Sequence, residues 1–332
     1  MSEHYPRIRR DGPTPQGERL LLREVVRIAF FMPYDHFDLL VGVERAIEAY
    51  HRAVGGGAET LCQAWFGDDE TPQSLLDEEG WRVVRDWLRP REPRYFLDDL
   101  GEETEFFRSK TKSGCDVFIH LTGAPARPAG YGLTYCARLP WRSPPDGSVS
   151  VLSATLPTEF LEEHGPGRVR ELAMEMASHL RISTGHAGLA LDFLRERSRL
   201  LPKLREEIFR YPGLDVPRGG LRSHVGTRVD GVHWLNFLGQ PVLDALGGAA
   251  SLRARLHFPE TTVQEMGTER VVVTLGQWPE AGDLAQGRDL PAYRELARVL
   301  EYWLDGFSPA YANSWKGYTQ EEVQRWWRRF LK

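Results

Sequence analysis

The stretch Val25-Val-Arg-Ile-Ala-Phe-Phe31 reads as a continuous apolar run near the start of the chain. Its length and its β-branched and aromatic side chains are typical of a strand that is buried on both faces. We therefore expect Ile28 and Ala29 to lie buried on opposite faces of one central strand. Pro33 and Asp35 follow the run, end the strand and open a helix.

Outward from this strand, helical and strand patterns follow one another in irregular order. The further strands expected from alternation and β-branched runs are residues 60–66, 116–121, 131–139, 148–154, 186–193, 252–257 and 270–275. The helices expected from apolar spacings of three and four are residues 40–54, 76–87, 169–180, 201–208, 235–246, 291–303 and 319–331. Because no regular βαβα alternation is present, the sequence predicts an α+β fold, with a mixed or antiparallel sheet flanked by helices.

The chain has no clear internal linker. Residues 1–19 are rich in proline, glycine and charge, which predicts a flexible N-terminal arm. Residues 20–332 are expected to form one large domain, with an added C-terminal helix over 319–331 that begins at the capping-box pattern Thr319-x-x-Glu322. The strand–helix–strand order of the opening recurs weakly around residues 186–230, which leaves two similar halves open.

One turn is specified in detail. Tyr211-Pro-Gly-Leu-Asp215 places proline and glycine at the two central positions, which suits a type II turn. That turn type requires a positive φ at Gly213.

Charge, cysteine content and hydropathy indicate the compartment. A net charge of -5 gives no general reason to bind nucleic acid or an anionic membrane. The 3 cysteines are an odd number without C-x-x-C spacing, so we expect no disulfide framework and a reducing compartment. The N-terminus lacks an apolar signal region, and no apolar run reaches the roughly 18 residues that span a bilayer. These features predict a cytoplasmic protein.

The familiar catalytic and metal-binding motifs are missing from the sequence. It contains no G-x-S-x-G, H-E-x-x-H or phosphate-loop pattern, and no cysteine–histidine group at zinc spacing. No lysine follows an acidic residue by two positions, so the strict form of a metal-dependent nuclease site is missing as well. We therefore predict no catalytic residue, no cofactor and no metal.

Acidic charge is concentrated in one stretch. From Asp68 to Glu105, thirteen acidic residues stand against five arginines, a net charge of −8 compared with -5 for the whole chain. An ordinary solvated surface accounts for such a stretch, but an acidic face that docks a basic protein partner is the sharper hypothesis. The residues selected as partner contacts are Asp68, Asp69, Glu70, Asp98, Asp99, Glu102, Glu103 and Glu105.

Four blocks of the second half carry a family resemblance. They are His186-Ala-Gly-Leu-Ala-Leu-Asp-Phe193, Arg210-Tyr-Pro-Gly-Leu-Asp215, Val232-His-Trp-Leu-Asn-Phe-Leu-Gly239 and Leu275-Gly-Gln-Trp-Pro-Glu-Ala-Gly-Asp283. Their order and spacing resemble the type VI secretion immunity family (TsiV-like), over about residues 20–305, with the last helix outside the shared region.

The resemblance implies a cytoplasmic protein that binds and neutralises a toxin delivered between bacteria. Some members protect against nuclease toxins, and the basic DNA groove of a nuclease would suit an acidic face. No catalytic residue carries over from the family. Two other hypotheses stay open from the residues alone: an enzyme of unfamiliar type, such as a hydrolase using scattered acidic residues, and a non-enzymatic scaffold or regulator.

Overall fold

The computed structural model describes residues 3–14, 17–67, 71–89, 104, 116–123, 130–141, 147–193, 197–216, 225–306 and 315–331. Its centre is strand β2 (Gly17–Met32), which pairs antiparallel with β7 (Ser150–Pro157) on one side and with β8 (Thr184–Phe193) on the other. Ile28 and Ala29 are both fully buried and belong to two separate apolar clusters. The predicted burial on both faces is therefore confirmed.

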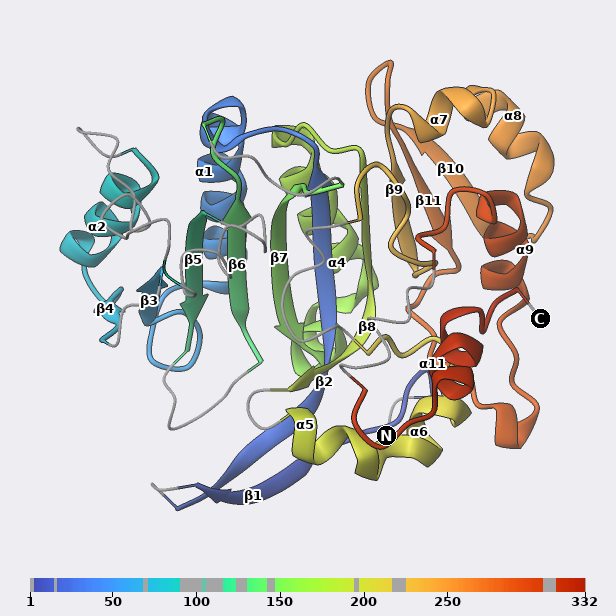
Figure 1. The fold of residues 1–332 in the computed structure, drawn as a ribbon, viewed down its shortest axis with the longest axis horizontal. Helices are drawn as coiled ribbons and strands as arrows, with labels where there is room; N and C mark the ends of the chain where they lie inside the picture. Colours follow the sequence, from blue (N-terminus) through green and yellow to red (C-terminus); the bar gives the residue numbers. More distant parts are fainter. Residues whose placement is uncertain are drawn as a thin grey trace.

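The strands form one sheet of eleven strands in the order β10-β11-β9-β8-β2-β7-β6-β5-β3-β4, with β1 paired to β2 beside this path (Figure 1). The other strands are β1 (Arg10–Thr14), β3 (Gln63–Phe66), β4 (Gln73–Ser74), β5 (Val117–Thr122), β6 (Gly132–Ala137), β9 (Leu235–Leu238), β10 (Thr261–Glu265) and β11 (Val271–Leu275). Each described pair is antiparallel, which confirms the α+β class. The predicted meander is β5-β6-β7.

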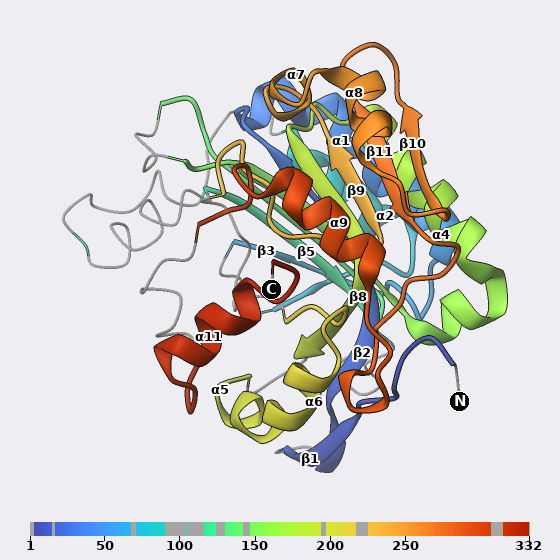
Figure 2. The ribbon, with the colours of Figure 1, turned by 90° about the vertical axis from the view of Figure 1, so that its right-hand side faces the viewer.

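Helices cover both faces of the sheet. The described α-helices are α1 (His36–Val54), α2 (Glu78–Leu88), α4 (Thr158–His179), α5 (Arg197–Leu200), α6 (Arg205–Arg210), α7 (Val242–Ala245), α8 (Gly248–Arg255), α9 (Pro291–Leu300) and α11 (Gln320–Trp327). Two 3-10 turns, η2 (Leu201–Leu204) and η3 (Leu284–Gln286), complete the set. Helices α1 and α4 pack together on one face, while α11 lies on the opposite side of the sheet (Figure 2).

The two faces of the central strands differ in polarity. Ile28 and Phe30 join the large core beneath α1 and α4. The opposite face carries Arg27, whose Nε donates to the Ser153 hydroxyl at 3.0 Å, together with His186 on β8. Arg27 and His186 are both buried. The apolar run that predicts β2 therefore also carries a buried cation on its second face.

Two predicted elements are wrong in type. Residues 235–246 begin as strand β9 and become helical only at Val242, because the four residues of β9 are all buried between β8 and β11. Residues 252–257 were expected as a strand, but the first four complete α8. An alternation of six residues is too short to outweigh a helix in which Leu252 is the buried contact and Arg253 and Arg255 face solvent.

The N-terminal segment, expected as a loose arm, packs against the body. Strand β1 pairs with β2, and Tyr5 and Ile8 are buried. Glu24 has no exposed surface and accepts hydrogen bonds from the Ile8 amide at 3.0 Å and from Arg9 at 2.8 Å. A buried carboxylate that is met by a cation and an amide fixes this segment more strongly than its composition suggests.

The pairing of one cysteine differs from the expectation. Cys62 is free and buried, whereas Cys136 is disulfide-bonded, so the expectation of no disulfide framework does not hold at Cys136. Within the described residues, every helix is too short or too polar to cross a bilayer.

Candidate functional site

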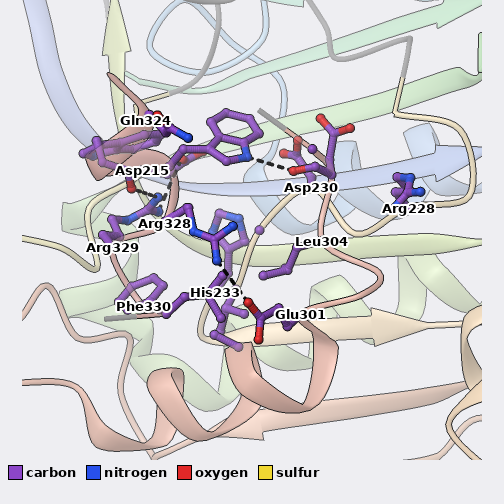
Figure 3. A pocket seen from close by; sticks show the side chains of 18 of the residues that line it. Asp215, Arg228, Asp230, His233, Glu301, Leu304, Gln324, Arg328, Arg329 and Phe330 are labelled. Carbon is purple, nitrogen blue, oxygen red and sulfur yellow. Dashed lines mark hydrogen bonds and ion pairs between the residues drawn. The ribbon is translucent and has the colours of Figure 1, made fainter. Parts of the chain in front are cut away.

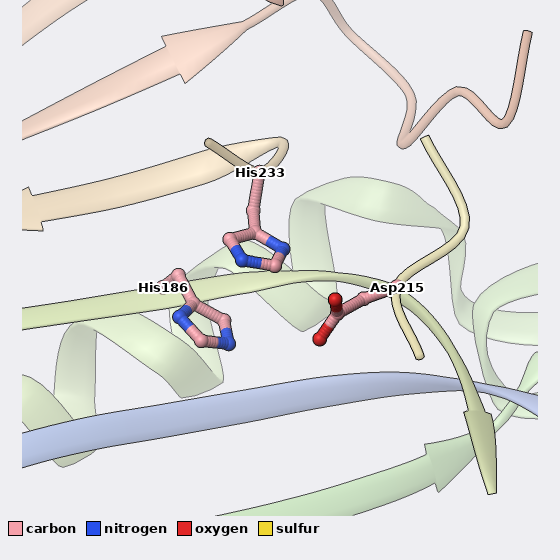
Figure 4. A group of neighbouring side chains, drawn as sticks. All are labelled: His186, Asp215 and His233. Carbon is pink, nitrogen blue, oxygen red and sulfur yellow. The ribbon is translucent and has the colours of Figure 1, made fainter. Parts of the chain in front are cut away.

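A group of polar side chains that could bind a metal ion or exchange a proton lies over β8 and β9. His186 projects from β8, His233 precedes β9, and Asp215 follows the turn that the sequence singles out (Figure 4). One ligand atom of each of these three residues lies within 4.8 Å of those of the other two. The two imidazole rings are stacked, with centroids 3.7 Å apart and planes inclined by 14°.

Main-chain hydrogen bonds hold Asp215 against β8. Its amide donates to the Leu189 carbonyl at 2.9 Å, and its carbonyl accepts from the Leu191 amide at 2.8 Å. The preceding turn is closed by the Leu214 amide, which donates to the Tyr211 carbonyl at 3.1 Å. The carboxyl group therefore extends from a rigid point of the sheet.

The predicted positive φ at Gly213 is wrong, because this residue does not belong to the glycines with left-handed backbone. Glycine is needed here because the backbone of the turn packs closely against the backbone of residues 280–281. A Cβ at this position would lie 2.0 Å from the carbonyl oxygen of Glu280, and the Gly213 amide donates to the Ala281 carbonyl at 2.8 Å. The turn thus lies directly on the 280–281 segment.

A local cap fixes His233. The Asn236 side chain accepts from the His233 amide at 2.9 Å and donates to the His233 carbonyl at 2.6 Å. Gly188, on β8, lies under the same residue, since a Cβ there would meet the His233 Cβ at 3.2 Å. Both histidines are buried, so the stacked pair is enclosed by protein.

Charged groups surround the pair. Arg27 and Arg329 each place a guanidinium nitrogen 3.8 Å from an oxygen of Asp215, and Asp230 places a carboxylate oxygen 3.8 Å from Nδ1 of His186. Burial lowers the pKa of Arg27, against the attraction of nearby carboxylates. Burial likewise lowers the pKa of Arg329 to about 10, opposed by Asp215. The site therefore holds two carboxylates and two cations in a poorly solvated setting.

A cavity of about 230 Å³ adjoins this cluster (Figure 3). Asp215, Asp230 and His233 form part of its wall, and the segment that contains α11 forms another part through Trp326 to Leu331. Arg328 bonds Glu301 at 3.0 Å across this wall. Among the described lining residues there is no serine, threonine, cysteine or lysine, and the polar side chains are mostly carboxylates and arginines. The available chemistry is proton exchange or the binding of a cation.

A sequence profile of the TsiV family, described as type VI immunity for VRR-NUC, matches residues 42–330. The chain belongs to this family. The match confirms the resemblance carried by the four blocks, and it extends through α11, which was expected to lie outside the shared region. The function is thus type VI immunity, as the resemblance implies.

A solved structure supports the same fold. The "Pseudomonas aeruginosa T6SS protein PA0821" superimposes with a TM-score of 0.68 at 18% identity, covering 99% of this chain and 92% of that chain. At this identity the likeness concerns the fold alone. A comparison with curated proteins finds no match.

The acidic partner contacts predicted for this TsiV-family chain lie outside the described residues: Asp68, Asp69, Glu70, Asp98, Asp99, Glu102, Glu103 and Glu105. Within the described part of the acidic stretch, helix α2 pairs its own charges. Arg82 bonds Glu79 at 2.5 Å and Asp86 at 2.5 Å, and Arg85 bonds Glu78. The unbalanced acidity of the stretch therefore lies on either side of α2.

The residues of the buried cluster carry no local motif that marks them as a site in the sequence. Three of them nevertheless lie in the blocks that carry the TsiV resemblance: His186 opens the first, Asp215 closes the second, and His233 is the second residue of the third. Short ligand spacings in the sequence cannot indicate a group that only strand pairing brings together. The convergence of separate family blocks on one place in the fold is the signal that could have indicated it.

Proposed function

We propose that this chain neutralises a VRR-NUC nuclease toxin by binding it directly, as a stoichiometric inhibitor without turnover. The family match over residues 42–330 carries the proposal. A nuclease toxin injures a cell where the DNA lies, so the inhibitor must meet it in the same compartment. We therefore place the protein in the cytoplasm.

The partner surface that we propose is the acidic stretch, for reasons of charge. A nuclease needs a basic groove to hold phosphates, and a negative surface on an inhibitor complements that groove. Of the surplus of eight negative charges between Asp68 and Glu105, seven come from residues 68–70 and 90–105, where nine carboxylates stand against two arginines. Helix α2 contributes little, since its carboxylates are paired with its own arginines.

The test is the kinetics of binding to the VRR-NUC toxin encoded beside this chain, at low and high salt. Reversal of Asp98, Asp99, Glu102 and Glu103 together should slow association and flatten its salt dependence. Exposed interface charges act mainly on encounter, and salt screens them over about 8–10 Å. Dissociation should change less if an apolar centre holds the complex.

A control reverses three acidic residues at the β10 edge of the sheet. Glu260, Glu265 and Glu269 are exposed on or beside β10, and their reversal should leave association unchanged. If the charge-reversed variant associates with the toxin at the native rate, the acidic stretch is not the contact. Failure of the unaltered chain to bind or inhibit the toxin at all would refute direct neutralisation itself.

One observation favours an enzyme as the second candidate: the His186, Asp215 and His233 group beside a cavity. Hydrolase and nuclease panels with added divalent metals distinguish the two functions. We expect no turnover, because the family match is to an immunity family. Turnover that disappears in an Asp215→Asn variant would favour the enzyme.

A further inference from the structure

We propose that His186, His233 and Asp215 form a binding site for a divalent transition metal of the zinc class. Two imidazole nitrogens and one carboxylate oxygen are a donor set that Zn²⁺ uses in proteins. The three donors come from three separate segments and lie within 4.8 Å of one another. The inference concerns the chain alone and does not depend on whether or how the toxin binds.

The separation of the donor atoms is close to that of a formed site. With metal–ligand bonds of about 2.0–2.2 Å in a tetrahedron, the ligand atoms are roughly 3.3–3.6 Å apart. The upper limit of 4.8 Å among the three atoms therefore needs a contraction on the order of 1 Å. Side-chain rotation must supply this contraction, because the backbone that carries Asp215 is bonded to β8.

The stacked rings define which movement is needed. Rings inclined by only 14° with centroids 3.7 Å apart do not both direct a nitrogen lone pair at one point. One ring must turn. His233 is the candidate, because its Nε2 lies near Gly231 in the cavity wall: a Cβ on that glycine would be 3.3 Å from Nε2.

Outer groups suit a metal at this place. A ligand histidine commonly has a carboxylate beside its second nitrogen, which fixes the tautomer and makes the ligand more basic. Asp230 stands 3.8 Å from Nδ1 of His186 and favours the proton on that nitrogen, so that the lone pair stays on Nε2. Three protein donors also leave a fourth position, and the adjoining cavity can supply water to fill it.

Two arginines compete with the metal ion and limit the affinity of the site for it. Arg27 and Arg329 each lie 3.8 Å from Asp215, so a metal competes with both for the same carboxylate. Asp215 and Asp230 offset these two cations, and Asp192 also acts on Arg27, so the metal competes with cations for carboxylates that already hold partners. We therefore expect a moderate affinity, and we expect Arg329→Gln to tighten binding by removing one competitor.

The experiment titrates Zn²⁺ into untagged, chelator-treated chain, with a chromophoric competitor to report the free ion. We expect one ion per chain and a higher melting temperature with zinc. His186→Gln and His233→Gln should abolish stoichiometric binding, and Asp230→Asn should weaken it about 10–100-fold. The matched control is His120→Gln, since His120 is a partly buried histidine that bonds Thr134 at 2.8 Å on the other half of the sheet.

The unaltered chain decides the matter even if a variant fails to fold. Substitution by Co²⁺ should give visible absorption bands of a nitrogen- and oxygen-ligated ion, and zinc should shift two histidine nitrogen signals in the spectrum of ¹⁵N-labelled chain. Absence of stoichiometric binding by the unaltered chain overturns the proposal. So does native affinity in a folded His233→Gln variant. Toxin binding is measured in a separate experiment, so the result of the zinc titration does not depend on whether the chain binds the toxin.

Discussion

Gly213→Ala is the substitution whose cost the structure specifies most directly. An added Cβ would lie 2.0 Å from the Glu280 carbonyl oxygen and 3.1 Å from the Ala281 Cα. Both obstacles are main-chain atoms, so no side-chain rotation relieves the contact. The turn and the 280–281 segment must separate by about 1 Å to reach the shortest distances that real Cβ atoms show.

The magnitude follows from two contributions. Forcing extra volume into a packed place costs about 1–3 kcal/mol. The separation also stretches the 2.8 Å hydrogen bond from the Gly213 amide to the Ala281 carbonyl, worth about 0.5–1.5 kcal/mol. Together they predict a loss of about 2–4 kcal/mol. For 332 residues the unfolding entropy is roughly 0.7 kcal/mol/K, so the melting temperature should fall by about 3–6 °C.

The assay is thermal and urea unfolding of Gly213→Ala beside Gly167→Ala. Gly167 lies within α4, has ordinary backbone and has no atom within 4 Å of an added Cβ. Alanine there should be neutral or stabilise by up to about 1 kcal/mol. Equal melting temperatures for the two variants would refute the reasoning, because the turn could then move away from residues 280–281 without a loss of stability.

Two further changes test other parts of the fold. Thr319→Ala removes the hydroxyl that accepts a hydrogen bond from the Glu322 amide in the confirmed capping box of α11. The substitution should lower the free energy of unfolding by about 0.5–2 kcal/mol and speed hydrogen exchange in α11. Unchanged exchange in α11 would contradict the role of the cap. Burial raises the pKa of Asp192 to about 6, against the pull of Arg23 and Arg27. A raised carboxyl pKa gives stability that is present below the unfolded value and lost as pH rises through about 6. Asp192→Asn should therefore gain about 2–3 kcal/mol relative to the unaltered chain between pH 4 and pH 7, and parallel urea-unfolding profiles of the two proteins would argue against this burial.

The sequence predicts elements well where one residue pattern has one structural solution. The apolar run at Val25–Phe31 suits a central strand, and β2 is that strand. The capping box at Thr319 predicts the start of α11 correctly. The wrong predictions lie where a short pattern suits two structures: the alternation at Leu252–His257 predicts a strand where α8 ends, and the apolar spacing over 235–246 predicts a helix where β9 lies.

The candidate site could not be predicted because its geometry comes from pairing. β8 lies antiparallel to both β2 and β9, and this brings Arg27, His186 and His233 to one face. No local spacing encodes that arrangement. Arg27 was visible inside the apolar run, however, and a cation in a buried strand implies a buried carboxylate to meet it. Asp215 is that carboxylate.

Strand β3, which precedes the acidic stretch in the sequence, and the histidine cluster lie in different halves of one sheet. Strands β3 and β4, which come before and after residues 68–70 in the sequence, lie at the sheet edge opposite β10, whereas the histidine cluster lies on β8 and beside β9. Five strand spacings separate β3 from β8, which at about 4.8 Å each is roughly 24 Å. That exceeds the distance of about 8–10 Å over which exposed charges act in physiological salt. A charge at the β3–β4 edge would therefore not attract a metal to the cluster, and the cluster would not speed the encounter of a basic toxin with that edge. If the toxin nevertheless bound differently with and without zinc, the coupling would have to pass through the packed strands between them, as a change in shape and not as a field.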